Sequence, residues 1–299
     1  MRITRKTAQG RSLRALTTAL VLALLAALLL AGSALAAAKP GRPTAKAPTG
    51  TIVTATPTFK WSKASGAAKY ELRVYRGSTQ KLKKAGLTKL SYKAVKALPT
   101  NVTLTWKVRA SNAAGAGAWS KSLTFKIISL AIGDAYRGGI VAYILASGDP
   151  GYVAGETHGL IAAAADQMSY PPGIQWPTEP YWNISVPGTN TNLGSGSANT
   201  DAIIAQNGAG LTYAAGLARA YTGGGYTDWF LPSKDELNQL YLNRVAIGGF
   251  ETTRDPLYPW YWSSSEGSSG NAWYQYFVSG DQFSASKYTT LRVRAVRAF

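Results

Sequence analysis

The chain has 299 residues, a formal net charge of +18, no cysteine and a single histidine, His158. Without cysteine it has no disulfide, no thiolate metal site and no cysteine nucleophile, and a Ser-His-Asp triad would depend on His158 alone. Because this histidine begins an apolar run, we interpret it as a structural imidazole. We therefore expect no enzyme, no cofactor and no bound metal.

The first 36 residues have the features of a secretory signal. A basic segment without acidic residues is followed by the apolar run 15–31 and by the small-residue site Ala34-Leu35-Ala36. We predict cleavage near Ala36, a secreted or cell-surface location, and no stable membrane span after cleavage. An uncleaved anchor is the alternative, because the run approaches the roughly 18 apolar residues that can span a bilayer.

Charge divides the rest of the chain into two parts. Residues 41–130 hold seventeen Lys and Arg and one acid, Glu71, which gives +16, whereas residues 131–299 hold nine basic and thirteen acidic residues, which gives −4. The asymmetry indicates two domains, preceded by a Pro-rich basic linker at residues 37–50. The basic domain is a possible contact for an anionic polymer, through lysines 81–96 in a region joining strands. A solvated lysine surface is the simpler alternative.

Residues 51–128 contain short alternating segments separated by turn residues. Apolar and polar positions alternate at 57–61, 70–75 and 104–112, and a Gly-rich turn precedes the last apolar segment, SLTFKII. This pattern predicts an all-β antiparallel sandwich with Trp61 and Trp106 in its core.

The segments YELRV and WKVRASNAAGAGAWS, with the early Trp61, resemble a fibronectin type III or related immunoglobulin-like domain. The resemblance covers nearly all of residues 50–128. Leu104 stands where that family usually places its corner tyrosine, so the corner hydrogen bond is expected to be absent. Modules of this family are most often spacers or adhesive units.

Residues 131–299 are predicted to form a mixed α+β domain. Apolar alternation indicates a strand after Gly138-Gly139 and another within residues 155–167. An ordered loop rich in Trp, Pro, Asn and Gly covers residues 174–197. Helices are expected at 199–208, beginning at a capping residue, and at 211–221.

The tract DWFLPSKDELNQLY, residues 228–241, predicts a turn and a capped helix. Ser233 is the expected N-cap, and Glu236 three residues later completes a capping box. An apolar face at helical spacing follows, and Gly248-Gly249 ends the helix. The residues of that face are Leu237, Leu240, Tyr241 and Val245. We interpret the tract as scaffold.

Seven short motifs occur in order across residues 133–299: GGIVAYI, GLIAAA, NTDAII, DWFLPSKDELNQLY, YWSSSE, AWYQYF and VRAVRAF. In these motifs the segment resembles the domain of unknown function at the C-termini of bacterial collagen-like adhesins. That domain belongs with C-type-lectin-like folds and is distantly similar to formylglycine-generating-enzyme domains. The resemblance implies helices flanking a small twisted sheet. The enzymatic relatives need copper-binding cysteines or an iron-binding His cluster, which this chain lacks, so no activity follows.

The predicted binding surface lies in residues 271–287. Side chains of a strand alternate between its two faces, so Trp273 and every second residue after it lie on one face, and Tyr274 and every second residue after it lie on the other. The sequence leaves open which of the two faces belongs to the core. The resemblance implies that this C-terminal stretch presents the ligand surface. Aromatic rings suit such contacts. The predicted ligand contacts are Tyr274, Tyr276, Asp281, Gln282 and Tyr288, whereas Trp260, Trp262 and Trp273 are expected to fill the core.

The leading hypothesis is a secreted or cell-surface bacterial binding or adhesion protein that recognises a glycan or protein surface through its C-terminal loops. The alternative is a structural cell-envelope protein held by its basic domain to anionic polymers. Arg294 and Arg297 are expected to hold the terminus through internal carboxylates. Calcium needs about six to eight oxygen ligands, and the acids available for it are Asp228, Asp235, Glu236, Glu266 and Asp281.

Overall fold

The computed structural model describes residues 38–254 and 258–299, so the predicted signal at 1–36 lies outside the described residues. The chain forms two compact units. The first comprises residues up to 50, 58–93 and 103–125, and the second comprises 51–57, 94–102 and 126–299. Within the described ranges, no helix has the length and apolar character needed to cross a membrane.

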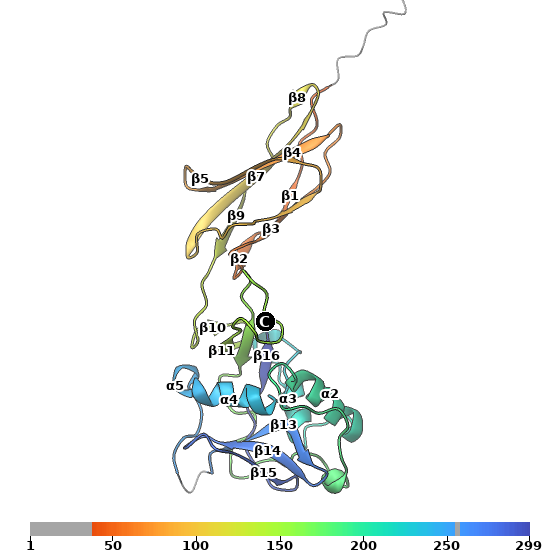
Figure 1. Cartoon of the computed structure of the whole chain (residues 1–299), viewed down its shortest axis with the longest axis vertical. Helices are drawn as coiled ribbons and strands as arrows, with labels where there is room; N and C mark the ends of the chain where they lie inside the picture. The colour runs from red at the N-terminus through yellow and green to blue at the C-terminus, as the bar shows by residue number, and fades with distance from the viewer. Residues whose placement is uncertain (1–37, 255–257) are drawn as a thin grey trace, which may run out of the picture. The chain divides into compact units, whose positions relative to one another are not determined.

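The first unit, together with the strand residues 51–52, 102 and 126–127, forms a sandwich of two β-sheets, drawn in red to yellow-green in Figure 1. One sheet has the order β1(Ala45–Ala47)-β3(Thr58–Trp61)-β6(Ser91–Lys93). The other has the order β2(Gly50–Ile52)-β9(Leu123–Ile127)-β7(Val102–Asn112)-β4(Lys69–Arg76)-β5(Thr79–Leu87), with β8(Gly115–Ala116) paired to β7. The pairs β1–β3, β3–β6, β4–β5 and β4–β7 are antiparallel. The predicted antiparallel sandwich is confirmed.

The core of the sandwich is aromatic. Phe59 lies 5.1 Å from Trp106 and 5.9 Å from Phe125 between ring centroids, and Trp61 lies 5.7 Å from Tyr70. All five side chains are buried. Trp61 and Trp106 are therefore core residues, as the alternation predicted.

Two sequence-based boundaries in this unit were wrong. The predicted linker at 37–50 contributes strand β1 and the first residue of β2, and the Trp106 indole N–H donates to the carbonyl of Pro48 at 2.9 Å. The strands β1 and β2 contain no proline themselves; Pro48 lies between them, and both strands are at sheet edges. Lysines 81–84, expected between strands, belong to the exposed edge strand β5.

The second unit combines two antiparallel sheets with helices. One sheet has the order β10(Ala135–Tyr136)-β11(Gly139–Ile144)-β12(Gly159–Ala162)-β16(Val296–Ala298), and the other has the order β13(Trp260–Ser268)-β14(Asn271–Tyr276)-β15(Gln282–Ser286). The helices are α2(Gly196–Asn207), α3(Ala214–Ala220), α4(Lys234–Leu242) and α5(Arg244–Ile247), with 3-10 turns η1(Tyr181–Asn183) and η2(Gly223–Gly225). A mixed α+β domain is therefore present, as expected.

Helix α4 begins as the sequence predicts. The Ser233 hydroxyl accepts from the backbone N–H of Glu236 at 3.2 Å, and the Glu236 carboxylate accepts from the backbone N–H of Ser233 at 2.8 Å. Its end was predicted wrongly, because the chain leaves the helix at Asn243 and turns into α5. Val245 is consequently 90% exposed, whereas Leu237 and Leu240 are buried.

Helix α2 starts three residues before the predicted start. Its N-cap is Ser195, and the predicted capping residue Asn199 lies inside the helix, buried. The Asn199 side chain instead holds the preceding loop, because its Oδ1 accepts from the Asn190 N–H at 2.8 Å and its Nδ2 donates to the Asn190 carbonyl at 2.6 Å. A polar residue inside the first turn was mistaken for the cap.

Arginines near the end of the chain join distant segments. Arg294, fully buried, donates from Nε to Asp166 Oδ1 at 2.7 Å and also reaches the carbonyl of Ala163. Arg297 forms a bidentate pair with Asp228, each bond 2.7 Å long. The expectation that both arginines bind internal carboxylates is confirmed.

Candidate functional site

Helix α4 covers one face of the sheet β13-β14-β15, shown in blue in Figure 1. Gln275 donates to Asn238 Oδ1 of the helix at 2.8 Å, and the Phe277 ring lies 5.6 Å from that of Tyr241. The Lys234 ammonium lies 4.6 Å from the centroid of the Trp273 ring. The face that carries Trp273 and Gln275 is thus the helix-covered face, which the sequence left open.

The opposite face carries a continuous row of aromatic rings. Trp260 faces Tyr276 across β13 and β14, and Phe283 of β15 faces Tyr274. Tyr274 lies 5.9 Å from Trp260 and 6.0 Å from Phe283 between centroids, and Tyr276 lies 6.3 Å from Trp260. We call this row, with the two tyrosines described next, the aromatic strip.

Two loop tyrosines extend the row beyond the sheet. The Tyr258 ring lies 5.1 Å from Trp260, and Tyr170 lies 4.9 Å from Tyr258. Tyr170 comes from a segment nearly ninety residues earlier in the chain, so the strip is assembled by the fold. Its members are Tyr170, Tyr258, Trp260, Tyr274, Tyr276 and Phe283.

The strip is partly exposed to solvent, most strongly at Phe283 and Tyr258. Phe283 is 49% exposed and Tyr258 is 40% exposed, while Trp260, Tyr274 and Tyr276 are half-buried. Burial raises the pKa of Tyr274 above its usual value, so its hydroxyl stays a neutral hydrogen-bonding group. A contiguous exposed aromatic surface is typical of a contact site.

Trp262 anchors the strip from below. It is fully buried, its indole N–H donates to the carbonyl of Ile174 at 2.9 Å, and its ring lies 6.3 Å from Tyr274. Because this contact fixes the ring under the strip, the surface rings above it have a rigid support.

A hollow adjoins the strip beside Trp260. Its volume is about 190 Å³, and its walls include Tyr258, Trp260, Tyr276 and the exposed Arg254. The strip therefore offers flat aromatic faces together with a recess that Arg254 helps to line.

The structure brings together only part of the predicted contact set. Tyr274 and Tyr276 lie together on the strip, and Asp281 is exposed in the turn between β14 and β15. Tyr288 is 61% exposed but lies against Trp182, 6.4 Å away between centroids, and belongs to no strand of the strip.

Gln282 does not fit the predicted role of an exposed contact. It faces Gln275 on the helix-covered side of the sheet, and its Nε2 donates to the Lys234 carbonyl at 2.8 Å. In the sequence Gln282 follows the turn signal Gly280-Asp281 and belongs to its polar surroundings. The alternation of β15 was the missed signal, because it places Phe283 on the side of Tyr274.

The tryptophans assigned to the core divide between two environments. Trp262 is buried as predicted, whereas Trp260 and Trp273 are half-buried. Trp260 was thus missed as a surface residue, together with Tyr170 and Tyr258, whose loops have no alternation to reveal their position.

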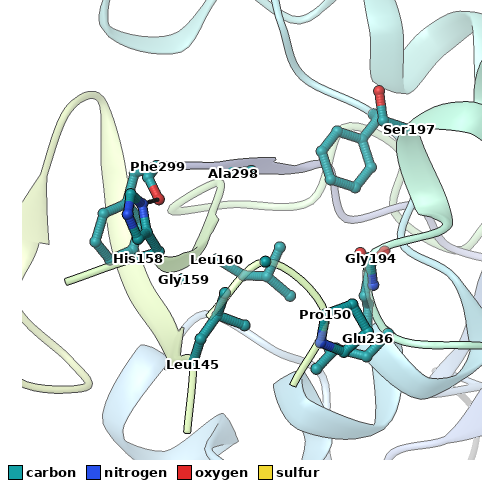
Figure 2. A pocket seen from close by; sticks show the side chains of 13 residues that line it. Leu145, Pro150, His158, Gly159, Leu160, Gly194, Ser197, Glu236, Ala298 and Phe299 are labelled. Atoms are coloured by element: carbon teal, nitrogen blue, oxygen red, sulfur yellow. Dashed lines mark hydrogen bonds between the residues drawn. The ribbon is translucent and has the colours of Figure 1, made fainter. Parts of the chain in front are cut away.

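A second concave site lies between β12, β16 and the start of α4, as Figure 2 shows. It is a cavity of about 260 Å³. Its apolar wall includes Leu145, Leu160, Phe230 and Phe299, and its ionisable groups are His158 and Glu236. In Figure 2 the imidazole lies beside Phe299, and Glu236 lies on the other side near Pro150 and Gly194.

Both ionisable groups of this cavity have structural partners. His158 contacts the Phe299 carbonyl through Nδ1 at 3.2 Å and Glu156 through Nε2 at 3.0 Å. The occupied ring nitrogens agree with a structural imidazole.

Glu236 is held by backbone groups. Its Oε1 accepts from the Gly194 N–H at 3.0 Å, and Oε2 accepts from Ser233. Burial raises the pKa of Glu236 to about 7, against the opposing effect of these N–H donors. A Cβ atom at Gly196 would lie 2.1 Å from Oε2, which explains a glycine at the start of α2. The buried carboxyl therefore joins α2, α4 and the loop before α2.

The acids considered for calcium do not gather. Glu266 pairs with Lys287 at 2.5 Å, Asp228 pairs with Arg297, and Glu236 binds backbone groups. Among residues 38–254 and 258–299, no three His, Cys, Asp or Glu side chains lie close enough together to hold a metal ion.

Residues 168–297 match the family described as the Lcl C-terminal domain. This range contains the whole aromatic strip. No curated protein matches the chain.

Solved fibronectin type III structures are similar to part of the chain. The crystal structure of FN3tt is 26% identical and covers 30% of this chain and 97% of its own, with a TM-score of 0.25. The human fibronectin type III domain containing protein 3 has a domain that is 23% identical and covers 31% and 90%, with a TM-score of 0.26. An Fn3-like protein from Clostridium thermocellum is 18% identical and covers 32% and 98%, with a TM-score of 0.24.

Proposed function

We propose that the protein is a secreted or cell-surface binding protein and that its aromatic strip contacts a glycan or a protein surface. The observation that carries the proposal is the row of partly exposed rings from Tyr170 to Phe283, with centroids 4.9 to 6.3 Å apart. The match to the Lcl C-terminal domain family supports a surface or adhesin-related role.

A glycan is the ligand class that this chemistry favours. The apolar faces of sugar rings stack on aromatic faces, and tyrosine adds a hydroxyl for the hydroxyl groups of the sugar. The hollow beside Tyr276 places Arg254 where it can donate hydrogen bonds to a polar substituent. A protein ligand would use the same rings as apolar anchors, and it is an outcome of the test below.

The proposal includes a C-type-lectin-like fold for the second unit and a place beside the C-terminal domains of collagen-like adhesins. Helix α4 against the three-stranded sheet, with long loops between elements, supports that fold. It assigns no catalysis to the protein, because the imidazole of His158 and the carboxyl of Glu236 are engaged in structural contacts.

The test is a glycan-array screen with the chain from residue 38 onward. Tyr276→Ala removes a ring from the middle of the strip without opening the buried core, and Tyr288→Ala removes an exposed tyrosine elsewhere in the same unit. We expect some glycans on the array to bind the parent and the Tyr288→Ala variant but not the Tyr276→Ala variant. If the parent binds no glycan on the array but binds immobilised surface proteins, and Tyr276→Ala abolishes that binding, the ligand is a protein. Equal binding by both variants would refute the strip as the site.

A structural role for the basic unit is the second candidate function. Lysines 81, 83 and 84 lie exposed on the edge strand β5, in a unit with one acidic residue. The long-range field of such a unit attracts polyanions and would hold the protein at an anionic cell envelope. Binding by the chain only at low salt, unaffected by Tyr276→Ala, would favour this candidate.

A further inference from the structure

Three cations of the first unit form one row across three strands. Arg73 of β4 stands opposite Lys107 of β7 on one side and opposite Lys83 of β5 on the other. Their neighbours along β4, Leu72 and Val74, are buried in the sandwich core. Alternation therefore places the three cations on the outer face of the larger sheet.

Trp119 gathers cations on this face. The guanidinium groups of Arg73 and Arg109 lie 5.0 and 4.6 Å from its ring centroid, and the Lys107 ammonium lies 5.1 Å away. Lys107 also lies 5.5 Å from the centroid of Tyr75. Contacts of this kind hold long side chains in place, which lowers the entropy lost when they bind a ligand.

Glu71 fixes two of these cations and leaves the face positive. Its Oε1 accepts from Arg73 Nε at 2.7 Å, and its Oε2 accepts from Arg109 Nε and Nη2 at 2.9 and 2.6 Å. Burial raises the pKa of Glu71, but the hydrogen bonds from Arg109 and Arg73 outweigh it, so the net pKa is lowered and the carboxylate stays ionised. Four cations against this one acid leave a charge of +3.

We propose that this cation–aromatic face, formed by Arg73, Tyr75, Lys83, Lys107, Arg109 and Trp119, binds a linear anionic polysaccharide. Charge complementarity comes from the +3 of the face within a segment of +16. Neighbouring strands lie about 4.8 Å apart, which is close to the length of one sugar residue in an extended chain. A row across the strands can thus meet successive carboxylate or sulfate groups through charge-assisted hydrogen bonds.

Protection of a sheet edge does not account for the whole arrangement. Charged side chains on β5 would keep that edge strand from pairing with another chain, which explains Lys83. It does not explain Arg73, Lys107 and Arg109, which belong to interior strands of the sheet and converge on one ring.

Single-stranded nucleic acid fits this face less well. Proteins that bind it stack bases on free aromatic rings. Here the cations already occupy contacts with the Trp119 ring, and Lys107 lies near Tyr75. The face therefore keeps its net positive charge, whereas the ring surface on which a base would stack is partly covered.

The test compares dextran sulfate and polygalacturonate with neutral dextran and a single-stranded DNA oligonucleotide, using the chain from residue 38 onward in about 0.15 M salt. The test variant is Arg73→Gln with Lys107→Gln. Its control, Lys60→Gln with Lys89→Gln, removes the same charge outside this face, because Lys60 lies exposed on β3 of the other sheet and Lys89 in the loop before β6. Melting temperatures of both variants establish that they are folded.

We expect the parent and the control to bind at least one anionic polysaccharide and not dextran. The test variant should lose about tenfold in affinity and show a shallower dependence on salt. A comparison of the affinities for dextran sulfate and polygalacturonate shows whether the face prefers sulfate or carboxylate groups. An equal loss in both variants would show diffuse charge attraction and overturn the proposal, as would absent binding, an unaffected test variant, or tighter binding of the oligonucleotide.

Discussion

Arg297 holds Asp228 through two hydrogen bonds of 2.7 Å, one to each carboxylate oxygen. Asp228 begins the tract that leads into helix α4, and Arg297 lies in the last strand, β16. The guanidinium also lies 3.9 Å from the centroid of Tyr226. This pair thus joins two segments that are 69 residues apart in the chain. No local pattern in the sequence indicates that they lie side by side.

Asp228→Asn is expected to destabilise the protein at pH 7 and to have little effect in strong acid. The hydrogen bond from Arg297 lowers the pKa of Asp228 below its usual 3.8, against a weaker opposing effect of burial. A lowered pKa stabilises the folded state above pH 3.8, and that contribution is lost as the pH falls through the folded-state value. Urea unfolding of both proteins from pH 2 to 7 measures the difference. A difference that does not change with pH would contradict this assignment.

The ionisation of Glu236 should change the pH dependence of stability in the opposite direction and in a different pH range. Its pKa is raised from 4.5 to about 7, so between these values the folded state holds a proton that the unfolded state has released. Stability should therefore fall as the pH rises from 4.5 to 7, by up to roughly 3 kcal/mol. Glu236→Gln should flatten this slope. Carbon-13 NMR of the glutamate side chains measures the pKa directly, and a value near 4.5 would refute the prediction.

Ser233→Ala should cost about 1 to 2 kcal/mol of stability, because an N-cap is lost. The hydroxyl accepts from the Glu236 N–H and also donates to the Asn192 carbonyl at 2.8 Å. Ser284→Ala is the matched control, since Ser284 is exposed on β15. Chemical denaturation measures both variants. If the two substitutions had the same small effect, the capping box would not contribute to stability.

Arg294→Leu should destabilise the second unit by about 3 kcal/mol, because it removes the closer of the two cationic partners of the half-buried Asp166, with Arg292 remaining as the other. Arg294 also donates to the carbonyls of Ala163 and Gly249. The comparison is Arg219→Leu, which removes the more exposed pair with Asp201 and should cost no more than about 1 kcal/mol. Calorimetric melting ranks the two, and a cost for Arg219→Leu as large as that for Arg294→Leu would contradict the account.

Local patterns in the sequence were sufficient where one strand or turn decides the structure. The alternation of residues 104–110 placed Trp106 in the core, and the spacing of Ser233 and Glu236 defined the start of α4. Local patterns failed where tertiary packing decides. Pro48 sits in a region that reads as a linker, yet its carbonyl accepts a hydrogen bond from Trp106.

The candidate site was only half predictable for the same reason. Tyr274 and Tyr276 follow from the alternation of one strand, but the choice of the open face depends on where α4 packs. Tyr170 and Tyr258 reach the strip from loops, and no pattern in the sequence pairs them. Gln282 was misplaced because one residue of register moves a side chain to the opposite face.

The most direct test of the central claim is a titration of the array-selected ligand against the parent, Tyr276→Phe and Tyr276→Ala. If the ligand stacks on the ring, the affinity of Tyr276→Phe should stay within a few-fold of the parent's, and that of Tyr276→Ala should fall about tenfold or more. The melting temperatures of both variants should be unchanged. If Tyr276→Ala bound the ligand as tightly as the parent, the aromatic strip would not be the binding surface.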